Sequence, residues 1–361
     1  MDGIGPSADA GDRGWVAEAV AELEREAARS ADTHLLRLEL PAFPGVRFYF
    51  KDESTHPSGS LKHRLARSLY LYALCNGRLS RGQPVVDASS GSTAISEAWF
   101  ARLLGLSFTA VMPENTAPAK VREIRALGAE CLLVPDGSDC AGLAQRHAAR
   151  IGGCFLDQFG LAERATDWRG NNNIAESLLA QLAREPQPVP DWIVCGAGTG
   201  GTSATIGRYL RYRRLPTRLC VAEPEGSAFA RGFGSRDRAA TASRASIIEG
   251  IGRPRVEPGF VFEVVERVLE IDDARSVAAS WLLESLLGRR YGGSSGTHFA
   301  ACLALAGELR AAGRGGVLVS LLGDRGERYG ETLYDPDWLA ARGLALAPAL
   351  AVLRRQAGLA A

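Results

Sequence analysis

Lys62 is the residue of this chain whose surroundings most favour covalent chemistry. It follows an apolar, strand-like run (46–50) and a group of turn and capping residues (57–60), so we expect it in the first turn of a helix. The helix dipole disfavours a cation there, which helps to make a neutral, nucleophilic amine available. Such an amine suits an imine with an aldehyde cofactor. Taken alone, a surface lysine is the simpler interpretation.

A loop rich in hydroxyl groups follows a short apolar strand at 85–88 and leads into a helical stretch at 95–104. Hydroxyls and the amides of a helix N-terminus form a cradle that suits an anion such as a carboxylate. Considered alone, the loop is better explained as a plain helix cap. We call it the hydroxyl loop, and its members are Ser89, Ser90, Gly91, Ser92 and Thr93.

A second loop, rich in glycine, follows the apolar run 192–195 and opens a helix predicted at 203–212. Glycines let backbone amides approach a phosphate, and two threonines add hydroxyl donors. We call it the glycine loop, and its members are Gly198, Thr199, Gly200, Gly201 and Thr202.

The glycine loop also belongs to a G-x-G-x-x-G pattern (196–201) that is typical of dinucleotide sites. Glu223 ends the following strand at roughly the distance expected for a ribose-binding acid. The usual fingerprint lies in the first βαβ unit, whereas this pattern lies in mid-chain, after the lysine and the hydroxyl loop. Its hydroxyls also exceed what a pyrophosphate turn needs. We therefore favour a phosphate site over a dinucleotide site.

Together these segments supply an imine-forming lysine, a carboxylate cradle and a phosphate cradle, which is the inventory for pyridoxal 5'-phosphate (PLP) acting on an amino acid. From about residue 31 to residue 330 the chain resembles the fold-type II PLP enzymes, the cysteine synthase and cystathionine β-synthase family. The resemblance implies that Lys62 bonds the cofactor, that the glycine loop holds its phosphate, and that the hydroxyl loop with Gln158 holds the substrate carboxylate. It also implies that Gly250 lies in a loop facing the substrate and that Ser294 meets the pyridine nitrogen.

Within that family the amino-acid sequence resembles most closely the stand-alone L-cysteine desulfhydrases. Cysteine synthases have an asparagine against the phenolic oxygen of PLP, where this chain has Ser92, and they usually have Lys-Asp-Arg where it has Lys62, His63 and Arg64. These departures are compatible with PLP binding and argue against the synthase reaction. The segments that carry the closer resemblance are 31–37, 61–64, 88–94 and 165–173.

This resemblance implies PLP-dependent β-elimination on L-cysteine, giving hydrogen sulfide, pyruvate and ammonia. Lys62 would remove the Cα proton while the hydroxyl loop and Gln158 hold the carboxylate; such positioning can contribute several kcal/mol. Ser294, a neutral partner, would leave the cofactor ring a weaker electron sink, which favours β-elimination. His63, His298 and Asp167 could handle protons or water, and structural roles are equally compatible with their positions.

Two other functions remain open. One is a PLP-dependent β-replacement enzyme, either cysteine synthase-like or a biosynthetic amino-acid synthase. The other is a PLP-binding regulatory or partner subunit without turnover. The intact lysine and hydroxyl loop weigh against the second, because decayed sites usually lose such residues.

Between these motifs, short apolar strands alternate with helices, which predicts an α/β fold with mostly parallel sheets covered by helices. The resemblance implies the two-lobed, tryptophan synthase β-like architecture. Parallel strands would place the binding loops at their carboxyl ends, the expected ligand crevice. Predicted strands include 107–112, 130–134 and 317–322, and predicted helices include 15–28, 120–127 and 141–151.

The resemblance also implies a domain organisation. We expect an N-terminal extension at 1–30, a larger PLP-binding lobe at 31–84 and 166–330, a smaller substrate-binding lobe at 85–165, and a C-terminal helical tail at 331–361.

Bulk properties exclude several functional classes. The 361 residues carry a formal net charge of +1, so no charge footprint indicates nucleic acid or an anionic membrane surface. No apolar run approaches membrane-spanning length, and the N-terminus lacks a signal-peptide pattern. Seven scattered cysteines without a C-x-x-C pair indicate free thiols in a reducing cytoplasm and no metal site. We expect a cytoplasmic homodimer acting on a small amino acid.

Overall fold

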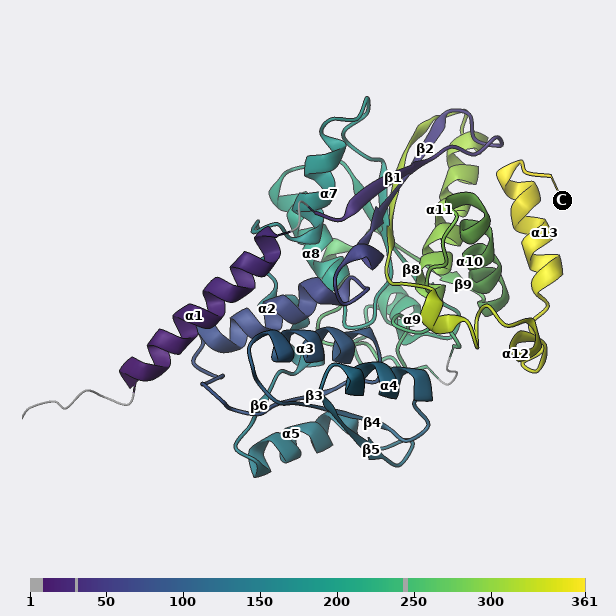
Figure 1. Ribbon diagram of the computed structural model, residues 1–361. Coiled ribbons are helices and arrows are strands. Elements are labelled where there is room, and N and C mark those ends of the chain that lie inside the picture. Colours follow the sequence, from purple (N-terminus) through teal and green to yellow (C-terminus); the bar gives the residue numbers. More distant parts are fainter. Residues whose placement is uncertain (1–8, 30–31, 243–245, 361) are drawn as a thin grey trace, which may run out of the picture. The chain divides into compact units, whose positions relative to one another are not determined.

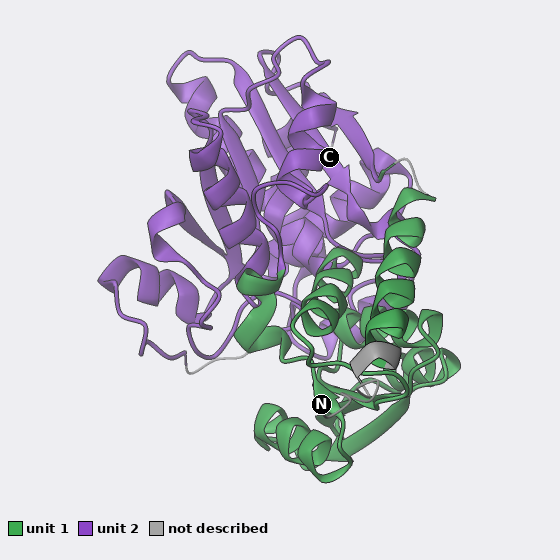
Figure 2. Ribbon diagram, turned by 90° about the vertical axis from the view of Figure 1, so that its left-hand side faces the viewer, with its two compact units in different colours: residues 1–32, 62–165 green, residues 33–61, 166–361 purple. Residues whose placement is uncertain are grey.

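The computed structural model describes residues 9–29, 32–242 and 246–360 (Figure 1). Residues 1–8 and 30 of the expected N-terminal extension and Ala31 lie outside the described residues. The chain divides into two compact units, coloured separately in Figure 2. Unit 1 comprises residues 1–32 and 62–165, and unit 2 comprises residues 33–61 and 166–361.

Unit 1 is built on a four-stranded parallel sheet in the order β5-β4-β3-β6. Successive side chains of a strand point to opposite faces, so Val85 packs with the core formed by α2 and α3 while Val86 packs with α5. Helices α3 and α4 cover one face and α5 the other (Figure 1). The strands are β3 (Val85–Ala88), β4 (Phe108–Pro113), β5 (Glu130–Val134) and β6 (Cys154–Phe155). The helices are α1 (Asp9–Ala28), α2 (Lys62–Cys75), α3 (Ser92–Leu103), α4 (Pro118–Ala126), α5 (Cys140–Arg150) and α6 (Gln158–Ala165).

Unit 2 contains a six-stranded sheet in the order β1-β2-β10-β7-β8-β9, parallel except for the edge strand β1. Its strands are β1 (His34–Leu38), β2 (Val46–Asp52), β7 (Trp192–Cys195), β8 (Arg218–Pro224), β9 (Arg267–Ile271) and β10 (Gly316–Leu322). Its α-helices are α7 (Ile174–Leu182), α8 (Gly201–Tyr212), α9 (Ala228–Ser235), α10 (Asp273–Leu287), α11 (Gly293–Ala311), α12 (Pro336–Ala340) and α13 (Leu346–Ala357). Three short 3-10 helices are η1 (Glu53–Thr55), η2 (Phe262–Val264) and η3 (Glu327–Tyr329).

Both faces of this sheet are covered, and its strands are accordingly apolar on both sides. Phe48 and Phe50 pack with α10, α11 and α13 on one face, whereas Tyr49 packs with α7 and α8 on the other. The same alternation places Val194 on the first face and Ile193 on the second. This two-sided burial explains why the strands read as short, continuous apolar runs.

The predicted α/β class with mostly parallel sheets is confirmed. The helix expected from residue 203 begins two residues earlier, because Gly200 adopts φ 84° as the N-cap residue and turns the chain directly into α8. The helix expected from residue 95 begins at Ser92, so part of the hydroxyl loop is already helical.

The structure also describes the cysteines and the helices and side-chain clusters relevant to membranes and metal ions. All seven cysteines are free. Within the described part of the chain, no helix combines the length and apolar character needed to cross a membrane. Over the same residues, no group of three His, Cys, Asp or Glu side chains is arranged to hold a metal ion.

Candidate active site

Lys62 is the first residue of α2, as predicted. The loop before it belongs to unit 2 and is anchored to the segment that follows β10. The Leu61 amide donates to the Gly323 carbonyl (2.8 Å), and the Arg325 amide donates to the Gly59 carbonyl (3.1 Å). Gly59 has φ 75°, a conformation that favours glycine. The residue directly before Lys62 is therefore held by backbone hydrogen bonds.

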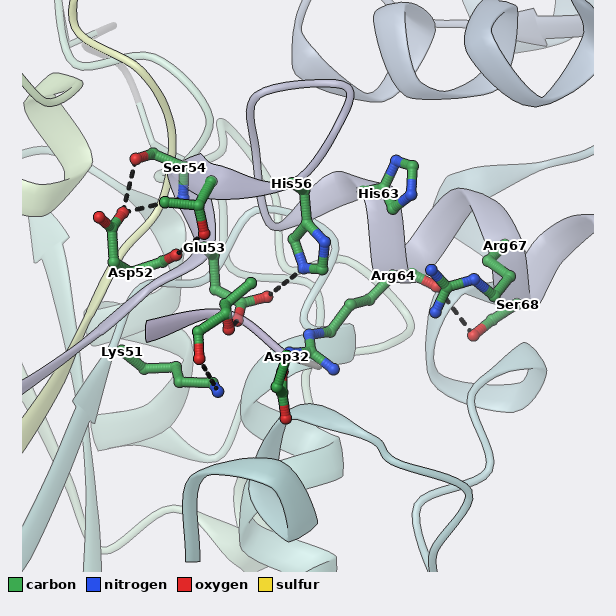
Figure 3. A network of polar contacts seen from close by, with 12 residues as sticks. Asp32, Lys51, Asp52, Glu53, Ser54, His56, His63, Arg64, Arg67 and Ser68 are labelled. Carbon is green, nitrogen blue, oxygen red and sulfur yellow. Dashed lines mark hydrogen bonds and ion pairs between the residues drawn. The ribbon is translucent and has the colours of Figure 1, made fainter. Parts of the chain in front are cut away.

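A buried polar network holds the chain between β2 and this loop (Figure 3). Lys51 donates to the Thr33 carbonyl (2.9 Å), and Thr33 Oγ1 donates to Glu53 Oε1 (2.6 Å). His56 Nε2 lies 3.0 Å from Glu53 Oε2. Each buried charge in this network thus has a hydrogen-bond partner, which buried charges require to be tolerated.

Ser294 lies in the first turn of α11, beside the anchored end of the lysine loop. A Cβ atom built on Gly323 would lie 3.1 Å from Ser294 Oγ and 3.4 Å from Leu61 Cδ2. The neighbouring Ser295 Oγ accepts a hydrogen bond from the Gly323 amide (3.0 Å). Unit 2 therefore brings the predicted pyridine-facing serine next to the residue that precedes Lys62.

The glycine loop connects β7 to α8 and packs against the predicted substrate-facing loop. A Cβ atom on Gly198 would lie 2.4 Å from the Gly250 carbonyl oxygen, so no other residue fits there without a shift. The Gly252 amide donates to the Ala197 carbonyl (2.8 Å). Thr199 Oγ1 accepts a hydrogen bond from the Gly201 amide (3.3 Å). Two motifs separated by about fifty residues in the sequence are thus joined.

His298 lies one turn after Ser294 on α11 and is buried. Its Nδ1 donates to the Leu321 carbonyl (3.0 Å), whereas its Nε2 has no hydrogen-bond partner among the described residues. A Cβ atom on Gly196, at the start of the glycine loop, would lie 2.7 Å from this Nε2. Burial lowers the pKa of His298 to about 4. At neutral pH it is an uncharged acceptor beside the glycine loop.

In unit 1, the hydroxyl loop forms the start of α3. Ser89 Oγ accepts hydrogen bonds from the amides of Gly91 (3.4 Å) and Ala94 (3.2 Å), so this serine caps the helix. Ser92 and Thr93 are the first two residues of the helix. The loop is therefore a helix cap, and it also exposes the N-terminal dipole that favours an anion.

Gln158 begins α6 and is joined to the strand before the hydroxyl loop. Its Nε2 donates to the Ala88 carbonyl (2.7 Å), and its backbone amide donates to Asp87 Oδ2 (3.2 Å). The two segments predicted to bind a substrate carboxylate thus lie together at the carboxyl end of β3.

A buried carboxyl pair, Asp87 and Glu97, lies beneath this cradle and was not predicted from the sequence. Neither oxygen of Glu97 accepts a hydrogen bond from the described residues. Burial, followed by the charge of Asp87, raises the pKa of Glu97 well above its ordinary value. Burial also raises the pKa of Asp87 to about 6. Burial beside a second carboxyl therefore favours the protonated form of Glu97. The available sequence signal was a single carboxylate in the largely apolar helix α3.

The three residues whose roles were left open have distinct settings. His298 is the uncharged acceptor described above. His63 is fully buried, with Nε2 3.0 Å from Glu26 Oε1. Asp167 is half-exposed and accepts a hydrogen bond from the Arg169 amide (3.2 Å), as a turn residue does.

Residues 29–321 match the family described as "Pyridoxal-phosphate dependent enzyme". The chain belongs to this family. PLP is therefore its cofactor, and the fold is the one shared by fold-type II PLP enzymes. L-cysteine desulfhydrase Cds1 of Mycobacterium tuberculosis (strain ATCC 25177 / H37Ra) is 53% identical over 336 residues, which span 92% of this chain and 91% of that protein.

Two solved structures of PLP enzymes share the architecture. O-ureido-L-serine synthase superposes with a TM-score of 0.75 at 30% identity, covering 85% of this chain and 96% of that one. The O-acetylserine dependent cystathionine β-synthase from Helicobacter pylori gives a TM-score of 0.72 at 25% identity, with the same coverage.

The residues of this PLP-dependent enzyme fit its cofactor. Close approach at Gly198 and the left-handed Gly200 leave backbone amides of the glycine loop at the N-terminus of α8, where an anionic phosphate is favoured. The unpartnered Nε2 of His298 is a buried polar atom at the start of the same loop. These features supply backbone amides, a helix N-terminus and a buried polar atom at the glycine loop, which suit the phosphate of PLP.

Proposed function

We propose that this protein is an L-cysteine desulfhydrase, a carbon-sulfur lyase that converts L-cysteine and water to hydrogen sulfide, pyruvate and ammonia. The observation that carries the proposal is the 53% identity to a named L-cysteine desulfhydrase over 92% of the chain. The agreement of the chain's own segments 61–64, 88–94 and 165–173 with the desulfhydrase pattern supports it.

The proposal assigns a role to each predicted site residue. When bound, PLP withdraws electrons from the Cα atom of the amino acid that it carries. Lys62 supplies the amine that attaches the cofactor, and its Nζ atom then accepts the Cα proton. The phosphate is assigned to Gly198, Thr199, Gly200, Gly201 and Thr202, and the other cofactor contacts to Ser92 and Ser294. The substrate contacts are assigned to Ser89, Ser90, Gly91, Thr93, Gln158 and Gly250.

The carboxylate cradle would determine the reaction geometry. A substrate carboxylate held by the α3 N-terminus and by Gln158 leaves the Cα–H bond in one orientation, which lowers the entropic cost of proton removal. The neutral Ser294 would leave the pyridine nitrogen largely unprotonated. A weaker electron sink favours prompt loss of the β-thiol.

A β-replacement reaction is the second candidate. The 30% identity to O-ureido-L-serine synthase over 85% of the chain supports it. In such an enzyme a nucleophile, rather than water, captures the three-carbon product of elimination. Ser92 and His63, which depart from the synthase pattern, favour the lyase.

The test uses purified protein, PLP and L-cysteine, with sulfide and pyruvate measured together and Lys62→Ala as the control. Equal amounts of sulfide and pyruvate, abolished by the substitution, are expected. Production of sulfide without pyruvate would indicate a β-replacement enzyme instead of a desulfhydrase. No product would exclude cysteine as the substrate, and O-acylated serines would be assayed next. A PLP-bound protein that leaves all these substrates unchanged would be a non-catalytic subunit.

The remaining parts of the proposal concern organisation. We assign PLP binding to the larger lobe (31–84 and 166–330) and substrate binding to the smaller one (85–165), with residues 331–361 as a helical tail. We also propose that the protein is cytoplasmic, which its free cysteines support. We further propose that it is a homodimer, which the family resemblance supports. Light scattering on the purified protein tests the dimer, and a monomer mass would refute it.

A further inference from the structure

Helix α1 lies entirely before residue 29, where the family match begins, yet it is part of the core of unit 1. Trp15, Ala19 and Leu23 of this helix pack in the same apolar cluster as Leu65 and other residues of α2. Its last turns also place Glu26, which is 7% exposed, against α2. The segment before the family match therefore contacts the helix that begins with Lys62.

Glu26 binds two side chains of α2 at once. Its Oε1 accepts a hydrogen bond from His63 Nε2 (3.0 Å), and its Oε2 accepts two from Arg67, at 3.1 Å from Nε and 2.7 Å from an Nη atom. His63 and Arg67 are four residues apart and so lie on one face of the helix. Figure 3 shows them as side chains of α2, with Arg64 beside them.

The charge of Glu26 is compensated locally. Burial by itself raises the pKa of this carboxyl, but the hydrogen bond from His63 and the charge of Arg67 outweigh it and leave the pKa lowered. Glu26 is therefore ionised at neutral pH, and a buried carboxylate is tolerated because both of its oxygens are satisfied.

His63 also contacts α3, whose first turn is the end of the hydroxyl loop. Its ring is fully buried and lies 4.9 Å from the Trp99 ring, edge-on, and 4.6 Å from the Phe100 ring. One side chain, adjacent to Lys62 in the sequence, thus contacts both α1 and α3. An aspartate in its place would put a second carboxylate against Glu26, so the histidine and Glu26 are complementary.

We propose that Glu26 and His63 are positioning residues for Lys62, through which the N-terminal helix α1 holds the first turn of α2 against α3. This inference rests on the proposed role of Lys62. The physical reason is that the first four backbone amides of a helix lack intrahelical partners, so a first turn depends on contacts from outside the helix. Without the pair, the Lys62 amine loses its fixed direction.

The test measures the fraction of PLP that borohydride reduction traps on Lys62, by peptide mass spectrometry, together with kcat and KM for L-cysteine. Four variants separate the contributions. Glu26→Ala removes all three hydrogen bonds that Glu26 accepts, and Glu26→Gln keeps an acceptor without the charge. His63→Phe keeps a ring without a donor, and His63→Gln keeps a donor without the ring. Glu22→Ala is the matched control, because Glu22 lies one turn earlier on α1 and, within the described part of the chain, pairs with Arg25 and Arg29 rather than with α2.

We expect Glu26→Ala and His63→Phe to lower kcat by about tenfold or more with KM within about threefold, since misplacing a reacting group affects the chemical step more than binding. The trapped fraction should fall in parallel, Glu26→Gln and His63→Gln should be intermediate, and Glu22→Ala should match the wild type. Wild-type trapping and kcat in Glu26→Ala would overturn the inference. An equal loss in Glu22→Ala would also overturn it, because the effect would then be general destabilisation of α1.

Trapping in the wild type separates this inference from the proposed function, and Lys62→Ala, which has no amine to trap PLP at this position, gives the background of the measurement. If the wild type traps no PLP on Lys62, the proposed function fails. If the wild type traps PLP and both Glu26 variants behave like it, only the positioning role fails. Should Glu26→Ala not fold, the comparison of Glu26→Gln with Glu22→Ala decides, and equality of those two with the wild type refutes the role.

Discussion

Gln158 Nε2 donates a hydrogen bond to the backbone carbonyl of Ala88 at 2.7 Å, across 70 residues of sequence. Ala88 is the last residue of β3 and directly precedes the hydroxyl loop. The side-chain amide is therefore fixed at the end of the strand before substrate arrives, and its direction does not depend on the ligand. Such preorganisation reduces the entropic cost of binding.

Replacing Gln158 by Ala should raise KM for L-cysteine by about tenfold with a smaller change in kcat, because the proposed hydrogen bond to the substrate carboxylate would be lost. Steady-state kinetics measure the two constants. Gln83→Ala is the control, since Gln83 also donates its side-chain amide to a backbone carbonyl, that of Gly152, but on an exposed loop. An unchanged KM in Gln158→Ala would remove this residue from the carboxylate site.

The stability of the Glu97→Gln variant, relative to that of the wild type, should increase as the pH rises. The pKa of Glu97 is raised in the folded state, so the folded protein holds a proton that the unfolded chain releases above about pH 4.5. The contribution of Glu97 to the free energy of unfolding of the wild type is therefore fully present below that pH. It decreases as the pH rises, by up to about 1.4 kcal/mol per pH unit. A glutamine keeps a donor toward Asp87 and does not titrate.

Thermal unfolding of the cofactor-free protein from pH 5 to pH 8 measures this effect. The difference in Tm between Glu97→Gln and the wild type should grow with pH, while the exposed Glu114→Gln should follow the wild type throughout. A difference that stays constant across the range would mean that Glu97 is ionised in the folded protein and that another donor satisfies it.

Gly198→Ala should weaken PLP binding far more than Gly250→Ala. A methyl group at Gly198 would meet the Gly250 carbonyl oxygen at 2.4 Å, so the two loops must separate. At Gly250 the added methyl meets nothing within 4 Å, and only the cost of φ 84° applies, which is on the order of 1 kcal/mol. Equilibrium dialysis of PLP with each variant gives the comparison. Equal affinities would show that the packing of these loops does not shape the phosphate site.

His298→Asn should reduce the loss of stability on acidification. The pKa of His298 is lowered from about 6.5 to about 4 by burial, so between these values the unfolded chain binds one more proton. Wild-type stability therefore falls as the pH decreases through this window, and asparagine, which can still donate to the Leu321 carbonyl, removes the effect. Chemical denaturation at pH 7 and pH 5 measures it, with the exposed His34→Asn as control; the prediction fails if both variants lose as much stability as the wild type.

The pH dependence of kcat distinguishes a structural His298 from a proton carrier. A group with a pKa near 4 does not change its charge between pH 6 and pH 8. We therefore expect the profile of His298→Asn over that range to have the shape of the wild-type profile. A limb of the profile that disappears in this variant would assign proton transfer to His298.

Local sequence predicted the position of Lys62 in the first turn of α2 and the strand–loop–helix arrangements of the hydroxyl loop and of the glycine loop. These features follow from turn residues, caps and short apolar runs, all of which act over a few neighbouring residues. The starts of α8 and α3 lie two and three residues before the predicted ones, because the chain turns into the helix after the N-cap residues Gly200 and Gly91, before the apolar pattern begins.

The contacts between these segments could not be predicted in the same way. The close approach of Gly198 to Gly250 and the neighbours of Ser294 near Gly323 depend on how β7, β8 and β10 pair within one sheet. Hydrogen-bond register between distant strands is a property of the assembled sheet and not of any one segment.

By itself the sequence determined the chemistry available to this protein: a lysine at a helix start, hydroxyls and glycines at two further helix starts, and the residue types that suit PLP and an amino acid. Only the tertiary structure decided the protonation states of the buried groups and the hydrogen-bond partners that hold them. The raised pKa of Glu97 beside Asp87, the uncharged ring of His298 and the pairing of Glu26 with His63 all arise from burial and from neighbours brought together by the fold. The cost of removing a charge from water is set by its complete surroundings, which only the folded chain provides.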